Sequence, residues 1–67
     1  MNMFAQRLKE LRLEKGLKQK ELASLLNTTD DSIYSWEKER SQPSLETFIL
    51  ICEIFGVSAD YLLGRED

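Results

Sequence analysis

The segment KELASLLNTTDDSIYSWE, residues 20–37, decides the fold, because two short amphipathic stretches in it are separated by only a few polar residues. Ala23, Asn27 and Ile33 stand four and six residues apart within this segment. Two helices joined so closely must cross steeply. This crossing requires a small residue where they approach, a residue that tolerates a left-handed backbone at the turn, and a branched apolar residue that locks the second helix in place. The three residues meet these requirements in order, so the segment predicts two helices joined by a tight turn.

The flanking sequence predicts three further helices. Helical periodicity, read together with residues that start or stop helices, places the five helices at about residues 3–15, 18–26, 30–38, 45–55 and 59–63. The expected N-caps are Thr29, Ser44 and Ser58, and the expected stops are Gly16, Asn27, Gly56 and Gly64. No segment alternates in the manner of a β-strand. The sequence therefore predicts one all-α domain over residues 1–67, with its core at about residues 4–64.

Helical spacing also predicts which side chains form the core. The predicted core-facing residues are Phe4, Leu8, Leu11, Leu22, Ala23, Leu25, Leu26, Ile33, Trp36, Leu45, Phe48, Ile49, Cys52 and Phe55. Leu13, Leu50 and Ile54 fall outside these stripes and are expected at the surface. Because exposed apolar side chains can mark contact surfaces, we expect the domain to pair with a second copy through its C-terminal half, near Ile54 and Tyr61.

Composition argues against an enzyme and against a metal site. The chain has no His and one Cys, and it has no glycine-rich phosphate loop, so Cys–His pairs, hydrolytic triads and zinc sites lack their residues. We therefore predict no catalytic residue, no cofactor, no metal and no small-molecule ligand. A single Cys52 cannot form an internal disulfide, which favours a reduced, cytosolic setting. Neither an apolar run long enough for a bilayer nor an export leader is present, so no membrane partner is expected.

Charge is distributed unevenly along the chain. The net charge is −3, from 9 basic and 12 acidic residues. Residues 1–20 carry six basic and two acidic side chains, a balance of +4, whereas residues 41–67 carry one basic and five acidic, a balance of −4. A nucleic acid responds to the local field rather than to the total. The basic N-terminal part therefore keeps a DNA partner possible in an acidic protein.

Two helices joined by a tight turn can present the second helix to the DNA major groove, which is about 12 Å wide. At this point the chain resembles the helix-turn-helix domain of phage repressor and Cro proteins and of similar bacterial regulators. The resemblance covers about Phe4 to Gly64 and rests on five motifs in order: RLKELR (7–12), KGLKQKELA (15–23), SIYSWE (32–37), PSLET (43–47) and FGVSADYLLG (55–64).

The resemblance implies a lambda-repressor-like fold of five short helices. It implies a transcriptional regulator, a repressor, that binds double-stranded DNA in a sequence-specific manner. The partner would be a palindromic operator, which the domain would bind as a homodimer. The protein would be encoded by a bacterium or a phage and act in the cytoplasm.

Carried over by position, the resemblance assigns roles to individual residues. Base edges would be read by Asp30, Asp31, Tyr34 and Ser35. The DNA backbone would be contacted by Gln19, Thr29, Lys38, Arg40, Ser41 and Gln42. Arg12 and Glu37 match a pair that bridges the first helix to the end of the third, which would hold the recognition helix in orientation. Ala23, Asn27, Ile33 and Trp36 would have structural roles.

Several positions depart from the family pattern, among them Ser35, which is short, Asn27, which replaces the usual Gly, and Thr28, which replaces a usual apolar residue. Asp30 and Asp31 stand where many relatives carry Arg, Gln or Lys; two carboxylates cannot read guanine but can accept from the cytosine amine. They also suit the positive end of a helix dipole, which is a purely structural role. Lys18 replaces a capping Ser or Thr, which predicts a frayed start for the second helix. The acidic face and negative total favour a second interpretation, a protein-interaction module or antirepressor-like subunit that keeps the fold without reading DNA.

Overall fold

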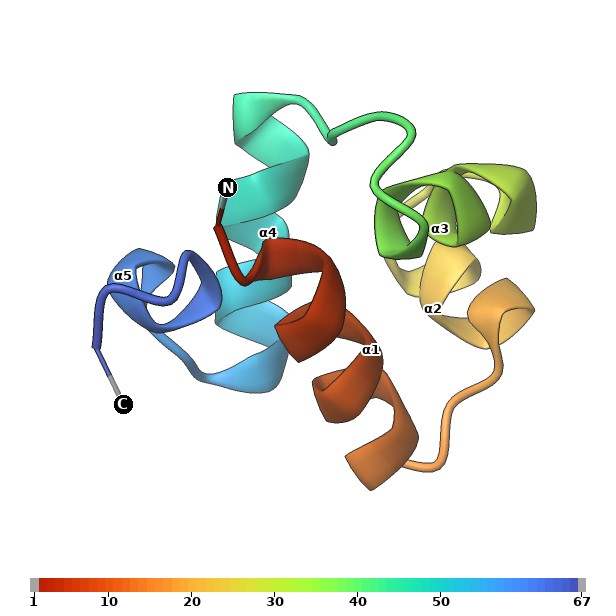
Figure 1. Ribbon diagram of the computed structural model, residues 1–67. Coiled ribbons are helices and arrows are strands. Elements are labelled where there is room, and N and C mark those ends of the chain that lie inside the picture. The colour runs from red at the N-terminus through yellow and green to blue at the C-terminus, as the bar shows by residue number, and fades with distance from the viewer. Residues whose placement is uncertain (1, 67) are drawn as a thin grey trace.

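Five helices form close to the predicted positions. In the computed structural model, which describes residues 2–66, the helices are α1 (Phe4–Glu14), α2 (Gln19–Leu25), α3 (Asp30–Glu37), α4 (Leu45–Phe55) and α5 (Ala59–Leu62). No residue in this range lies in a strand, so the predicted all-α fold is confirmed. α1 lies between the α2–α3 pair and the α4–α5 pair (Figure 1), and it contacts both α3 and α5. None of the described helices combines the length and apolar character needed to cross a bilayer.

Three helices begin at the hydroxyl N-caps that the sequence predicts. The side chains of Thr29, Ser44 and Ser58 each accept a hydrogen bond from the backbone N–H three residues later. α2 begins differently, because the backbone N–H of Lys18 donates to Oε1 of Glu21 at 2.7 Å. Lys18 provides no side-chain cap, as expected, but a carboxylate in the first turn of α2 satisfies an N–H of the helix start.

Each of the five helices is followed by a residue of positive φ. These residues are Gly16, Asn27, Glu39, Gly56 and Gly64, with φ between 56° and 78°. At each of them the next backbone N–H bonds to the carbonyl five residues earlier, as Arg40 does to Ser35 at 2.9 Å. Four of these stops are predicted from Gly and Asn. Glu39 carries no such signal, because glutamate has no preference for a left-handed backbone.

The core contains one fully buried side chain from each helix: Leu8, Leu22, Ile33, Ile51 and Leu62. Phe4, Ala23, Leu26 and Trp36 are also buried and complete the cluster. A small domain buries a limited apolar area, so a contribution from every helix matters for its stability. The predicted inward orientation of the α1 and α3 residues Phe4, Leu8, Ile33 and Trp36 is confirmed.

Leu25 of α2 is wrongly predicted as a core residue. Its side chain is 53% exposed, whereas Leu22, Ala23 and Leu26 are buried. Adjacent residues on a helix are separated by about 100° around its axis. Leu25 therefore lies beside the buried face rather than on it.

The orientation of α4 also differs from the prediction. Leu45 and Ile49 are 74% and 50% exposed, whereas Ile51 is fully buried. Leu50 and Ile54, expected at the surface, pack against the core. The segment LETFILICEIF is apolar on almost every side, so its periodicity does not select one stripe. Packing against the other helices decides which residues of α4 turn inward.

Candidate nucleic-acid interface

α3 packs one side into the core and leaves the other open. Ile33 and Trp36 are buried on its inner side. Asp30, Asp31 and Tyr34 are exposed on its outer side, where Tyr34 keeps 42% of its surface accessible. α2 and α3 form the side of the molecule remote from α5 (Figure 1). The predicted base-reading residues therefore lie on an accessible surface, except that Ser35 is half-buried.

The turn between α2 and α3 has the geometry that the residue spacing predicts. Asn27 adopts φ 56° and so takes the left-handed conformation at the end of α2. The backbone N–H of Thr28 donates to the carbonyl of Ala23 at 2.9 Å, and Ala23 is 2% exposed. α3 then starts at once, because the Thr29 hydroxyl oxygen accepts from the Ser32 N–H at 3.2 Å. Thr29 thus serves first as the N-cap of the exposed helix.

A buried ion pair connects α1 to the end of α3. Arg12 donates from Nε to Oε2 of Glu37 at 2.7 Å and from Nη2 to Oε1 at 3.1 Å. The two side chains are only 9% and 4% exposed. Arg12 also donates from Nη1 to the carbonyl of Leu17 at 2.8 Å, in the turn between α1 and α2. A bidentate pair in this position fixes the orientation of α3 against the rest of the domain.

Gln19, the predicted backbone ligand at the start of α2, is held by the same carboxylate. Its Nε2 donates to Oε1 of Glu37 at 3.1 Å, and its side chain is half-buried. An amide nitrogen carries two hydrogens, so this bond orients the group and uses one of its two N–H donors. Sequence reasoning did not find this contact, which joins residues 18 positions apart.

Two exposed cations lie at the C-terminal end of α3. The Lys38 Nζ lies 5.7 Å from the Tyr34 ring centroid, and the Arg40 Cζ lies 5.6 Å from it. The hydroxyls of Ser35 and Ser41 are hydrogen bonded at 2.7 Å, which ties the following loop to the helix. The structure thus brings together five of the predicted DNA-contacting residues: Tyr34, Ser35, Lys38, Arg40 and Ser41.

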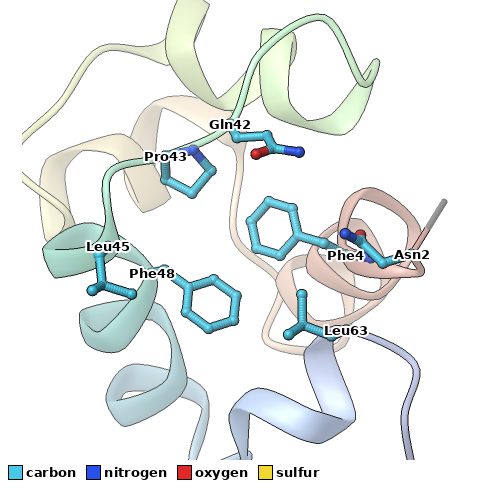
Figure 2. Close-up of a pocket in the computed structure, with 7 residues that line it drawn as sticks. All are labelled: Asn2, Phe4, Gln42, Pro43, Leu45, Phe48 and Leu63. Atoms are coloured by element: carbon cyan, nitrogen blue, oxygen red, sulfur yellow. The ribbon is translucent and has the colours of Figure 1, made fainter.

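Gln42 follows Ser41 and lines a pocket together with Arg40 and Ser41. It also lines a groove of about 350 Å³ together with Asn2, Phe4, Pro43, Leu45, Phe48 and Leu63. Figure 2 shows Gln42 and Pro43 on one side of the groove, with the rings of Phe4 and Phe48 below them. Phe4 and Phe48 are in tilted contact, with 5.7 Å between their centroids. The groove is lined by apolar and neutral side chains.

Charge divides α3 into two ends. Asp30 and Asp31 lie in its first turn, and Lys38 and Arg40 follow its last. Among residues 2–66 the ion pairs are Arg12–Glu37 and Arg65–Asp60, so neither carboxylate at the start of α3 is neutralised by a cation. In the same range, no cluster of ligand-type side chains could hold a metal ion.

On α4, burial raises the pKa of the Cys52 thiol, which leaves it protonated and apolar at neutral pH.

Comparison with known proteins places this geometry in context. A family model described as helix-turn-helix matches residues 8–62. The HTH-type transcriptional regulator ImmR of Bacillus subtilis is 36% identical over 64 residues, which cover 96% of this chain and 50% of ImmR. The chain spans about half the length of the curated relatives it matches first.

Solved structures share the same arrangement of helices. A transcriptional regulator from Listeria innocua superposes with a TM-score of 0.91 at 30% identity, covering 100% of this chain and 63% of that one. The P22 c2 repressor, solved in complex with a synthetic operator, superposes with a TM-score of 0.88 over 98% of this chain and 100% of its own. Its identity is 21%, so this second likeness concerns the fold alone.

Proposed function

The chain belongs to the helix-turn-helix family, and from this membership we propose that it binds double-stranded DNA in a sequence-specific manner as a transcriptional regulator, a repressor, with α3 in the major groove. One observation carries the proposal. The inner side of α3 is anchored by Ile33 and Trp36, so that its outer side, with Asp30, Asp31 and Tyr34, stands open next to two cations. We place this activity in the cytoplasm, where bacterial DNA lies.

The proposed contacts follow from where each side chain stands. Base edges would meet Asp30, Asp31, Tyr34 and Ser35. The two carboxylates are suited to accept from the N4 amine of cytosine, which presents a donor in the major groove. The phosphate backbone would be contacted by Gln19, Thr29, Lys38, Arg40, Ser41 and Gln42. Such contacts position the domain, whereas the base contacts carry the sequence preference.

The test is a selection from random duplex DNA at about 50 mM salt, where electrostatic contributions to binding are strong. We expect enrichment of one motif in which cytosine occupies the positions opposite Asp30 and Asp31. If no motif is enriched at this salt concentration, DNA reading is the wrong function. The acidic start of α3 would then favour the other candidate function, which is docking of a basic protein partner. A pull-down of the protein with defined basic peptides tests that function.

We also propose that the domain binds a palindromic operator as a homodimer. Half-sites read by paired helix-turn-helix domains are about 34 Å apart, one turn of the duplex, so two copies on one operator are neighbours. Leu45, which is 74% exposed, stands on the rim of the groove in Figure 2, next to the loop after α3. An exposed Leu45 beside an apolar groove suits a two-fold interface, in which the Leu45 side chain of each copy enters the groove of the other copy.

The location of this contact differs from the one expected from sequence. Ile54 packs against the core, and Tyr61 is half-buried with the Arg7 guanidinium 4.2 Å from its ring centroid. These two residues are therefore poorly placed to meet a second copy. The exposed side of α4 also carries Glu46 and Glu53 beside Ile49, and like charges would repel there. The groove beside Leu45 has no charged lining residue, which favours that end of α4.

A further inference from the structure

We infer that Tyr34 is a positioning residue, whose ring holds Lys38 and Arg40 as a preformed pair of cations for DNA phosphates. The inference rests on the proposed function, because it assigns Tyr34 a task within the same interface. It replaces the base-reading role given to Tyr34 above, since the ring would act on affinity for every sequence.

The first cation is placed by the helix itself. Lys38 stands four residues after Tyr34, and side chains at this spacing lie on the same face of a helix. The Lys38 Nζ is 5.7 Å from the ring centroid, within the range at which a cation is attracted to an aromatic face. Lys38 is exposed and directly follows the last residue of α3. The backbone N–H of Lys38 donates to the carbonyl of Tyr34 at 3.0 Å, which keeps residue 38 in register with the last turn of α3.

The second cation is placed by the turn that ends α3. Glu39 adopts φ 61°, which reverses the chain immediately after the helix. The backbone N–H of Arg40 then donates to the carbonyl of Ser35 at 2.9 Å, and this bond returns Arg40 to the level of Tyr34. Its Cζ lies 5.6 Å from the ring centroid. Backbone geometry thus directs the guanidinium to the same ring as Lys38.

The loop beyond Arg40 is held as well. The Ser35 and Ser41 hydroxyls are hydrogen bonded at 2.7 Å, so the segment that carries Arg40 is tied to α3 on both sides of that residue. Long basic side chains lose considerable rotamer freedom when they bind a phosphate. A ring that already confines two of them lowers this loss, because less freedom remains to be removed on binding.

The charge of the molecule makes these two cations important. Lys38 and Arg40 are the only basic residues between positions 21 and 64. They follow a helix whose first turn carries two carboxylates that repel phosphate. Between residues 21 and 64, attraction to the DNA backbone therefore comes from this pair. We conclude that confining the pair against Tyr34 strengthens binding to any duplex.

The test measures affinity by fluorescence anisotropy at about 50–200 mM salt for the wild type, Tyr34→Leu, Tyr34→Phe and the control Leu13→Ala. Leu13 is an exposed apolar residue of α1, at 57% exposure. One duplex carries the motif that the wild type selects from random DNA, and a second duplex of equal length carries an unrelated sequence. The same measurements are made on the double variant Lys38→Gln/Arg40→Gln, with and without Tyr34→Leu, and complete a mutant cycle between the ring and the two cations.

We expect Tyr34→Leu to weaken binding to both duplexes by the same factor, about two- to fivefold. The slope of log affinity against log salt should become shallower by up to about 0.9 for each phosphate contact that is lost. Tyr34→Phe should keep the wild-type slope, because it keeps the ring. Leu13→Ala should match the wild type. In the background without the two cations, Tyr34→Leu should have no further effect.

Three results would overturn the inference. One is a change in preference between the duplexes with an unchanged salt slope, which would mean that Tyr34 reads bases. Another is a Tyr34→Phe variant as weak as Tyr34→Leu, which would assign the effect to the hydroxyl. The third is a full Tyr34→Leu effect in the background without the cations. If the wild type selects no motif and binds neither duplex, the proposed function itself fails, and this outcome differs from all three.

Discussion

At the scale of single residues, Glu37 accepts hydrogen bonds from side chains of two other helices. One of its oxygens accepts from Arg12 Nε, and the other accepts from both Arg12 Nη2 and Gln19 Nε2. α1, α2 and α3 therefore meet at one carboxylate. Arg12 in turn has no other carboxylate partner in the range that the structure describes. Loss of the Glu37 carboxylate would leave the Arg12 guanidinium, whose side chain is 9% exposed, without a carboxylate partner.

Glu37→Ala is expected to destabilise the fold by about 3–5 kcal/mol, because it leaves a buried charge uncompensated. Urea denaturation of the purified protein, followed by circular dichroism, measures the change. The matched control is Asp60→Asn, which removes the exposed pair with Arg65, whose side chains are 63% and 74% accessible. That substitution should cost about 0–1 kcal/mol. Equal losses for both variants would contradict the structural role of the buried pair.

Asp31→Ala tests the acidic start of the recognition helix. Asp31 is exposed and lies in the first turn of α3. If its carboxylate accepts from cytosine, the variant should lose about 1–3 kcal/mol of preference for that base. The measurement is the affinity for the selected duplex and for duplexes changed at single positions. Removal of a carboxylate that only opposes phosphate would instead tighten binding to every duplex alike, and that outcome would remove Asp31 from the base-reading set.

At the scale of elements, the helix ends determine how the interface is presented. Asn27 turns the chain from α2 into α3, and Glu39 turns it from α3 back along the helix. Both adopt positive φ without being glycine. Asparagine tolerates this region because its short polar side chain can bond locally, whereas for other L-residues it costs about 1–2 kcal/mol. The turn after α3 therefore carries the larger strain.

Glu39→Gly is expected to stabilise the domain by about 0.5–1 kcal/mol. Glycine adopts positive φ without steric cost, and this gain exceeds the extra backbone entropy that glycine loses on folding. The urea midpoint at constant slope measures this change. Asn27→Gly is the matched comparison and should give a smaller gain, since asparagine already suits the conformation. A less stable Glu39→Gly protein would mean that the Glu39 side chain contributes more than its backbone costs.

At the scale of the whole molecule, positive and negative charge are concentrated in different parts of the chain. The N-terminal twenty residues carry the positive balance and residues 41–67 the negative one. The neutral groove of Figure 2 has the loop after α3 and the start of α4 on one side and Asn2, Phe4 and Leu63 on the other. Contacts with a second copy would be best tolerated there, because the remaining exposed side of α4 carries carboxylates.

Leu45→Glu is expected to weaken pairing on DNA without unfolding the domain, because Leu45 is 74% exposed and a charge there would meet an apolar groove. Sedimentation of the protein with a palindromic duplex should then show one copy bound where the wild type shows two. Leu25→Glu, at a 53% exposed site on α2, is the control and should leave the stoichiometry at two. A Leu45→Glu protein that still binds in pairs would move the interface elsewhere.

Some features of this protein follow from residues that are close together in the chain. Thr29, Ser44 and Ser58 start helices and Asn27 turns the chain for local reasons, since the groups involved are only a few residues apart. The spacing of Ile33 and Trp36 likewise predicts the buried side of α3, and with it the exposed position of Asp30, Asp31 and Tyr34. Tyr34 and Lys38, four residues apart, also come together for a local reason.

Other features were decided only when the helices packed. α4 is apolar nearly all round, so contact with the other helices, rather than periodicity, buries Ile51 and leaves Leu45 and Ile49 outside. The bond from Gln19 to Glu37 joins side chains that are distant in sequence, and it exists because α2 and α3 cross at the Asn27 turn. Local preference determines where a helix begins and ends, whereas the competition among apolar faces for one small core determines which of its sides is buried.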